Sequence, residues 1–265
     1  SSAVVPREEK TMLECSALPT TVPIAISYRP KANDYLPVVV AAIRRFLGDW
    51  PIVLLTQARH LPPPAWLEAW HVDTITDWAH SDNANKVLRL WEHQEIFAAH
   101  FERWIWWHDD MLLLRPVADP PAEFSAPRVR HLARTRPNKK LSNWHVWLWD
   151  TLGFFESLSM PSHNPVCHIP RLIDRKVLQS VPREWNRQRL LFEPTYLLWH
   201  WHHSGAEVEL ADGFRTCIFQ GEMPALDTVA RSGATLLNWG RRIDHASAQE
   251  SFATHYPLCF DGRPG

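Results

Sequence analysis

The sequence predicts an α/β protein in which helices flank a mixed sheet within a single domain. The first observation is that apolar stretches at 22–28 and 51–56, typical of buried strands, enclose a segment at 35–47 with helical spacing of apolar residues. Two strands joined through a helix lie parallel and connect by a right-handed crossover. The second observation is that the alternation continues, with a strand at 71–76, a helix at 84–100 and a further apolar strand. This order is typical of α/β folds.

Each helix in this first part has one apolar face. Asp34 stands where it can cap the first helix. The face residues are Leu36, Val39, Val40, Ile43 and Leu47 in the first helix, and Val87, Leu90, Trp91, Gln94 and Phe97 in the second. Between the two helices, a proline-rich loop at 57–64 precedes a short helical piece at 66–70. Residues 1–21 show no periodicity and are predicted to be a loose leader.

The C-terminal part is predicted to combine helices with short strands. A helix at 143–158 carries an apolar stripe that includes Trp144, Trp147 and Phe155, and Asp174 begins another helix. The remaining predicted elements are helices at 189–203 and 246–254 and strands at 207–210, 215–219 and 234–237.

The composition is that of an ordinary globular protein. The chain has 265 residues, 45% of them hydrophobic, a net charge of −1 and a pI near 6.9. Charge therefore gives no global attraction to nucleic acid or anionic membrane. The four cysteines are far apart and form no Cys-x-x-Cys pair, which argues against a zinc ribbon or a disulfide scaffold. Because no apolar run reaches the roughly 18 residues of a membrane span and no signal-peptide pattern begins the chain, we expect a cytoplasmic protein, in the host cytoplasm if viral.

Two adjacent aspartates, Asp109 and Asp110, stand where the apolar strand 104–107 ends, and a second apolar run, 111–114, follows at once. Carboxylates this close raise each other's pKa unless a cation neutralises them. Hard oxygen ligands suit Mg²⁺ or Mn²⁺, which bind through one or two carboxylates together with substrate phosphates. The alternative is a solvated turn, but the flanking strands favour a metal–phosphate site.

Other polar residues also follow predicted strands. Arg29, Asn33, the 78–86 loop and the aspartate pair all lie at strand exits, and ligands of open α/β sheets bind at the carboxyl ends of strands. We therefore expect them to share one crevice. Glycine-rich phosphate loops and a G-x-S-x-G motif are absent from the sequence, which argues against classical dinucleotide, ATP and serine-hydrolase sites.

One dense basic stretch and one histidine pair each have two interpretations. The basic residues either contact phosphates or form a solvated face; they are Arg128, Arg130, Arg134, Arg136, Lys139 and Lys140. His200 and His203 have a spacing that can ligate zinc, but without matching ligands nearby packing or solvent exposure is favoured.

The layout resembles that of glycosyltransferases of the GT-A (Rossmann-like) fold, and more narrowly the small glycosyltransferases of tailed bacteriophages. The resemblance lies in Tyr28-Arg29-Pro30 followed by Asn33-Asp34, in Asn85-Lys86, in His108-Asp109-Asp110-Met111, and in His168-Ile169-Pro170 with Asp174. The aspartate step departs from the family pattern, because His108 replaces the usual asparagine. A more distant resemblance is to Stealth-type sugar-phosphate transferases, although their opening Trp-Val-Asp-Gly block is missing.

The resemblance implies a nucleotide-sugar donor, with a UDP-sugar favoured, and a Mn²⁺ or Mg²⁺ ion. The implied donor-binding residues are Arg29, Asn33, Asn85, Lys86 and Asp109; the implied metal ligands are Asp109, Asp110 and His168; and the implied catalytic residues are His168, Asp174 and Asp110. His168 could instead be a structural loop histidine, and Asp174 could orient it or cap a helix. Residues 22–116 would form the nucleotide-sugar half of the domain and 117–265 the acceptor half.

The acceptor remains open at this point. One acceptor is double-stranded DNA with 5-hydroxymethylated pyrimidines, in which case the basic stretch would follow the phosphates. The alternative is a glycan or cell-surface polysaccharide, which needs no such patch. Two other classes are a non-catalytic carbohydrate- or nucleotide-binding module, which would leave the aspartate pair unexplained, and a metal-dependent hydrolase, which would release sugar or phosphate without an acceptor.

Overall fold

The computed structural model describes residues 22–28, 34–56, 70–73, 83–130, 143–187, 190–211, 216–240 and 242–260. Its strands are β1 (Ile24–Ser27), β2 (Ile52–Thr56), β3 (Trp70–Asp73), β4 (Arg103–Trp107), β5 (Met111–Leu113), β6 (Arg128–Val129), β7 (Arg171–Asp174), β8 (Glu209–Leu210), β9 (Thr216–Phe219) and β10 (Leu236–Trp239). Its helices are α1 (Leu36–Leu47), α2 (Asn83–His100), α3 (Pro120–Ser125), α4 (Asn143–Ser157), α5 (Arg175–Ser180), α6 (Arg183–Arg187), α7 (Phe192–Ser204), α8 (Leu226–Arg231) and α9 (His245–His255), followed by a 3₁₀ turn (Pro257–Cys259). None of the helices in these ranges combines the length and the apolar character needed to cross a membrane.

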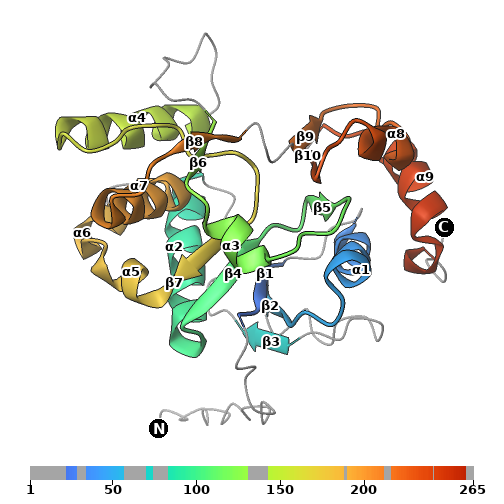
Figure 1. The fold of residues 1–265 in the computed structure, drawn as a ribbon, viewed down its shortest axis with the longest axis horizontal. Coiled ribbons are helices and arrows are strands. Elements are labelled where there is room, and N and C mark those ends of the chain that lie inside the picture. Colours follow the sequence, from blue (N-terminus) through green and yellow to red (C-terminus); the bar gives the residue numbers. More distant parts are fainter. Residues whose placement is uncertain are drawn as a thin grey trace, which may run out of the picture.

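The main sheet has five strands in the order β3-β2-β1-β4-β7. The first four are parallel, and β7 runs antiparallel to β4 at the edge. Figure 1 shows α1 on one side of this sheet and α2 and α7 on the other. Neighbouring residues of β4 accordingly enter different cores, Trp107 with α1 and Trp106 with α2 and α7. The prediction of a mixed sheet flanked by helices is confirmed.

A second sheet of three strands, β5-β10-β9, packs beside α1. β10 is antiparallel to β5 and parallel to β9. Only three residues separate β4 from β5, so the chain passes from the main sheet to the second sheet through the turn His108–Asp110. The aspartate pair therefore lies at the junction of the two sheets. A third sheet has two short strands, β6 and β8.

Most elements of the first part agree with the sequence prediction, and the differences gather in the second part. The predicted helix at 66–70 lies outside the described residues except for Trp70, which belongs to β3. The sequence does not predict β7, α3, α6 or α8. Asp34 accepts a hydrogen bond from the backbone N–H of Leu36 at 3.0 Å, although Tyr35 is the residue at the N-cap position.

Both halves of the predicted domain contribute to the same sheets. β7 pairs with β4, and β10 pairs with β5, so strands from beyond residue 117 complete both the main and the second sheet. A division at residue 116 remains a prediction, while the leader at 1–21 lies outside the described residues.

Candidate active site

The aspartate pair is held on a short, well-anchored turn. Trp107 and Met111 on either side are buried, at 0% and 2% exposure, whereas the turn residues themselves are half-buried. The Met111 N–H donates to the carbonyl of His108 at 3.3 Å, and the Trp107 indole N–H donates to the carbonyl of Met111 at 2.9 Å. On the outer side, the Trp239 N–H donates to the carbonyl of Asp110 at 3.4 Å. Two buried strands, β4 and β5, thus present the two carboxylates at the carboxyl end of β4.

His168 reaches the same place from a distant loop. Its backbone carbonyl accepts a hydrogen bond from the side-chain Nδ2 of Asn238 at 3.0 Å, and Asn238 lies opposite Met111 in the β5–β10 register. Upstream in this loop, the carbonyl of Asn164 accepts from the N–H of Arg130 at 2.7 Å. Burial, with smaller contributions from the charges of His108 and Arg130, lowers the pKa of His168 to about 4. At neutral pH the imidazole is therefore neutral and has a nitrogen lone pair available to accept a hydrogen bond.

Stability should fall on acidification because of His168. Its pKa is lowered in the folded protein, so between pH 6.5 and about 4 the unfolded chain binds a proton there that the native protein does not bind. Stability is then present above pH 6.5 and is lost as the pH falls towards 4, by about 2–3 kcal/mol for this group. Urea unfolding of the wild type and His168→Gln across this range measures the effect as a difference. If the free energy of unfolding changed with pH in the same way in both proteins, the prediction would be contradicted.

Arg171 and Glu193 form a buried ion pair close to His108. The Arg171 Nε donates to Glu193 Oε1 at 3.4 Å, with the two side chains only 1% and 9% exposed. The Nη2 of Arg171 donates to the carbonyls of Arg128, at 3.0 Å, and of Pro165. Burial raises the pKa of Glu193, while the nearby charges of Arg171 and His108 lower it. This pair ties β7, α7 and the loop before His168 together.

Two sequence-based assignments need correction. Asp174 pairs with Arg103 at the start of β4, the opposite end from the aspartate pair, and its carboxylate caps α5 by accepting from the N–H groups of Lys176 and Val177. It therefore does not orient His168. Arg128 is held by Glu123 at 2.8 Å and by Glu209 at 3.2 Å, so its guanidinium already has two carboxylate partners and does not form an open phosphate patch.

Several predicted residues cannot be placed against the pair. Arg29, Asn33, Arg134, Arg136, Lys139 and Lys140 lie outside the described residues, and Asn85 and Lys86 are described only as backbone in the first turn of α2. The α2 start lies towards the carboxyl end of β4, because α2 ends immediately before β4 begins. His200 stacks on Tyr196 and the His203 ring bonds to the carbonyl of Trp199, as the packing interpretation predicts.

Sequence reasoning missed Asn238, Arg171 and Glu193. Asn238 and Glu193 lie in stretches rich in apolar residues, Arg171 begins β7, and all three are buried. Such a position is a signal in itself, because a buried polar group is retained only where it is bonded or paired. The predicted strand at 234–237 ended one residue before Asn238.

The ligand set fits a hard divalent cation in number and type. Asp109 and Asp110 supply carboxylate oxygens, which Mg²⁺ and Mn²⁺ prefer, and one or two carboxylates plus substrate phosphates are usual for Mg²⁺. In the described ranges, no three His, Cys, Asp or Glu side chains gather closely enough to hold an ion by themselves. The predicted set of three ligands, Asp109, Asp110 and His168, is therefore not gathered as a metal site, and the fit is to an ion held by the two aspartates and shared with a phosphate-bearing ligand.

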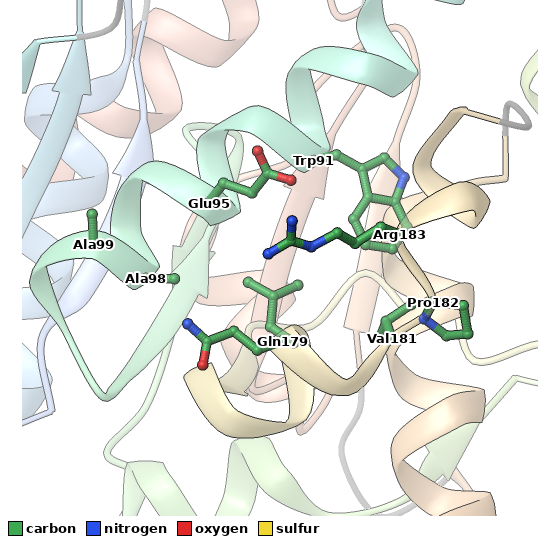
Figure 2. A pocket seen from close by; sticks show the side chains of 9 residues that line it. Trp91, Glu95, Ala98, Ala99, Gln179, Val181, Pro182 and Arg183 are labelled. Atoms are coloured by element: carbon green, nitrogen blue, oxygen red, sulfur yellow. The ribbon is translucent and has the colours of Figure 1, made fainter.

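A large cavity of about 800 Å³ lies elsewhere, between α2, α5 and the start of α6. Figure 2 shows the Glu95, Gln179 and Arg183 side chains around this cavity. Ala98 and Leu178, which also line it, are level with the start of β4, since Arg175 next to Asp174 bonds to the carbonyl of Ala98. The cavity is therefore at the other end of the main sheet from Asp109 and Asp110.

No family model and no curated protein matches this sequence. Among solved structures, the fold is similar to a glycosyltransferase involved in the glycosylation of the major capsid of PBCV-1, with 11% identity and a TM-score of 0.40 over 88% of this chain and 98% of that chain. It is also similar to the galactosyltransferase LgtC in complex with donor and acceptor sugar analogues, with 12% identity and a TM-score of 0.45 over 92% of this chain and 98% of that chain. Similarity at this level assigns neither a family nor an activity.

Proposed function

We propose that the protein is a glycosyltransferase that moves a sugar from a nucleotide-sugar donor to a hydroxyl acceptor with the help of Mn²⁺ or Mg²⁺. The observation that carries the proposal is the junction of the two sheets, where Asp109 and Asp110 lie at the carboxyl end of a central parallel strand and β10 links the backbone of Asp110 to the backbone of His168. Open α/β sheets bind their ligands at this edge. The motifs that resemble the GT-A pattern, His108 to Met111 and His168 to Pro170, are the ones that meet here.

The aspartates and His168 have different proposed roles. Asp109 and Asp110 would hold the cation, which would supply Lewis-acid neutralisation of the charge on a departing nucleoside diphosphate. The neutral imidazole of His168 accepts a hydrogen bond from the acceptor hydroxyl and orients its oxygen. With a pKa of about 4 the imidazole is a weak base, so we assign His168 the orientation of the hydroxyl. The bond from this oxygen to the sugar forms as the bond from the sugar to the diphosphate breaks, and the hydroxyl proton passes to the departing nucleoside diphosphate or to solvent.

A donor screen tests this proposal. We expect one class of nucleotide sugar, with UDP-sugars tried first and GDP-, ADP- and CDP-sugars next, to raise the midpoint of thermal unfolding in the presence of Mn²⁺. A ligand at a hundred times its Kd adds about 2.7 kcal/mol of stability, which a melting curve resolves. Stabilisation should shrink sharply when the ion is omitted. Absence of any shift with all four donors would contradict the proposal.

Turnover then separates the enzyme from its alternatives. A binding module would be stabilised by the sugar nucleotide without consuming it. A hydrolase would release free sugar or phosphate in the absence of an acceptor. A transferase consumes the donor at an appreciable rate only when a suitable hydroxyl is supplied.

For the acceptor, the placement of two arginines favours a glycan hydroxyl over DNA. Arg128 is bound by Glu123 and Glu209, and Arg130 lies close enough to His168 to lower its pKa. Of the six basic residues that could have followed a DNA backbone, Arg128 is therefore paired with two carboxylates and Arg130 lies near His168. The donor identified by the screen can be offered oligosaccharides and duplex DNA with hydroxymethylated pyrimidines side by side.

A further inference from the structure

Two side chains of the second sheet hold the loop that carries His168. The Nδ2 of Asn238 on β10 donates to the carbonyl of His168 at 3.0 Å, and the Oγ1 of Thr216 on β9 donates to the carbonyl of Cys167 at 3.3 Å. These are the carbonyls of consecutive residues, and the two donors come from adjacent parallel strands. The loop is thus anchored through its backbone, which leaves the imidazole of His168 outside the anchoring contacts.

The backbone of His168 is strained. Its φ is 53°, in the left-handed region that residues with a side chain adopt at a cost of about 1–2 kcal/mol. Glycine would adopt this conformation without that cost. Strain of this kind persists where the surroundings enforce it, and it concentrates at functional sites. The presence of a histidine here, rather than glycine, is accounted for if its side chain has a task that outweighs the strain.

Asn238 is itself an expensive residue at its position. It is only 3% exposed, and its buried Oδ1 has no hydrogen-bond partner among the residues that the structure describes. An unsatisfied buried polar atom costs about 1–3 kcal/mol, and an apolar side chain at this position in the buried strand would avoid that cost. Since a carbonyl oxygen only accepts hydrogen bonds, the amide nitrogen must be the group that faces His168. The contact with His168 is therefore the reason we find for an amide at this position.

The β10 strand also joins His168 to the aspartate pair. Asn238 lies opposite Met111, and the next residue, Trp239, donates its N–H to the carbonyl of Asp110 at 3.4 Å. One strand therefore contacts Asp110 through its backbone and His168 through a side chain. The separation between the two groups is set by consecutive residues of a paired strand, which is a rigid support.

We infer that Asn238 is a positioning residue that fixes His168 against Asp109 and Asp110. The inference rests on the proposed transferase function for its kinetic consequences, but the anchoring of His168 can be measured without turnover. Asn238 contacts no reacting atom in this scheme and acts only through the backbone of His168.

Asn238→Leu removes the donor while keeping a side chain of similar shape and no charge. With the donor found by the screen, we expect kcat to fall about 10–100-fold, since small misplacements of an orienting group can cost that much, while the KM for the donor changes little. His168→Ala should show a loss of similar size. Because Asn238 acts through His168, the double variant should be no slower than His168→Ala alone. If kcat of the double variant is instead reduced by the product of the two single losses, the inference is overturned.

Thr216→Val is the matched control. It removes the neighbouring anchor, to the carbonyl of Cys167, with a side chain of nearly identical shape, and we expect kcat to change less than about threefold. A loss equal to that of Asn238→Leu would mean that any loosening of the loop suffices, which contradicts a specific role for Asn238. If Asn238→Leu does not fold, Asn238→Val, which also lacks the donor, takes its place in the same comparison.

A chemical measurement tests the positioning of His168 independently of the proposed transferase function. Carbethoxylation of His168 by diethyl pyrocarbonate, located by mass spectrometry, should be several-fold faster in Asn238→Leu than in the wild type or in Thr216→Val. If the wild type transfers no sugar yet His168 shows this change, the proposed function fails and the positioning inference stands. If transfer is found but carbethoxylation and kcat are the same in Asn238→Leu and the wild type, the positioning inference fails alone.

Discussion

Replacing Arg171 by leucine should lower the free energy of unfolding by about 3–5 kcal/mol, the usual cost of removing one partner from a buried ion pair. The guanidinium is 1% exposed and binds Glu193 together with the backbone carbonyls of Arg128 and Pro165. Without it, the carboxyl of Glu193 stays buried without its cationic partner, and two carbonyls lose a donor. Urea unfolding at pH 7 measures the change.

The double variant Arg171→Leu/Glu193→Leu provides the control. Apolar replacement of both partners avoids the buried unpaired acid, so we expect it to be more stable than Arg171→Leu alone. The cost of Arg171→Leu should also be smaller at pH 5 than at pH 7.5. The pKa of Glu193 is raised in the folded protein, and stability linked to such a group is present at low pH and lost as the pH rises through that pKa. Strictly additive costs, unchanged by pH, would contradict this account.

The parallel half of the main sheet is predictable because its signals are local. Buried strands such as β1 and β2 are continuous apolar runs, and α1 between them has one apolar face, so each is legible within its own segment. The position of Asp109 and Asp110 follows from the same logic, since the end of a parallel strand identifies the ligand edge.

The remainder of the site depends on pairing between distant segments, which no local pattern encodes. β7 has four residues, and its Asp174 gives a clear helix-capping signal whatever its distance from the ligand edge. The position of Asp174 depends on the antiparallel register of β7 with β4, which places Asp174 beside Arg103, at the end of β4 opposite to the aspartate pair. Arg128 similarly looks like an available cation until Glu209, 81 positions later, is seen to pair with it.

Asn238 is a second residue whose partner cannot be identified from the local sequence. An asparagine at the end of an apolar strand has no partner visible in the sequence, because its partner is a backbone carbonyl 70 residues away. What could be read locally is only that a polar group in this strand must be satisfied somewhere. Only the fold determines that this partner is the carbonyl of His168.

Asp110→Asn should reduce sugar transfer at least about 10²–10³-fold while leaving the fold intact, the scale found when an electrostatic contact to a developing charge is removed. The fold should tolerate the change because Asp110 is half-buried on a turn, and its structural contact to Trp239 uses the backbone carbonyl. Replacing a carboxylate by an amide of the same shape removes negative charge next to Asp109 and weakens cation binding. Transfer rates at saturating donor, with thermal unfolding of each variant, measure both parts of the expectation.

Asp49→Asn is a matched change at the amino ends of the parallel strands, opposite to the aspartate pair. Asp49 is exposed and precedes β2, so the same loss of one carboxylate there should leave transfer unchanged. Incubation of the wild type with EDTA should reproduce the loss seen in Asp110→Asn, and added Mn²⁺ or Mg²⁺ should restore activity to the wild type but far less to the variant. Full activity in EDTA would show that the aspartate pair does not work through a cation. Equal loss in Asp49→Asn would show that net charge, rather than the junction of the two sheets, determines the rate.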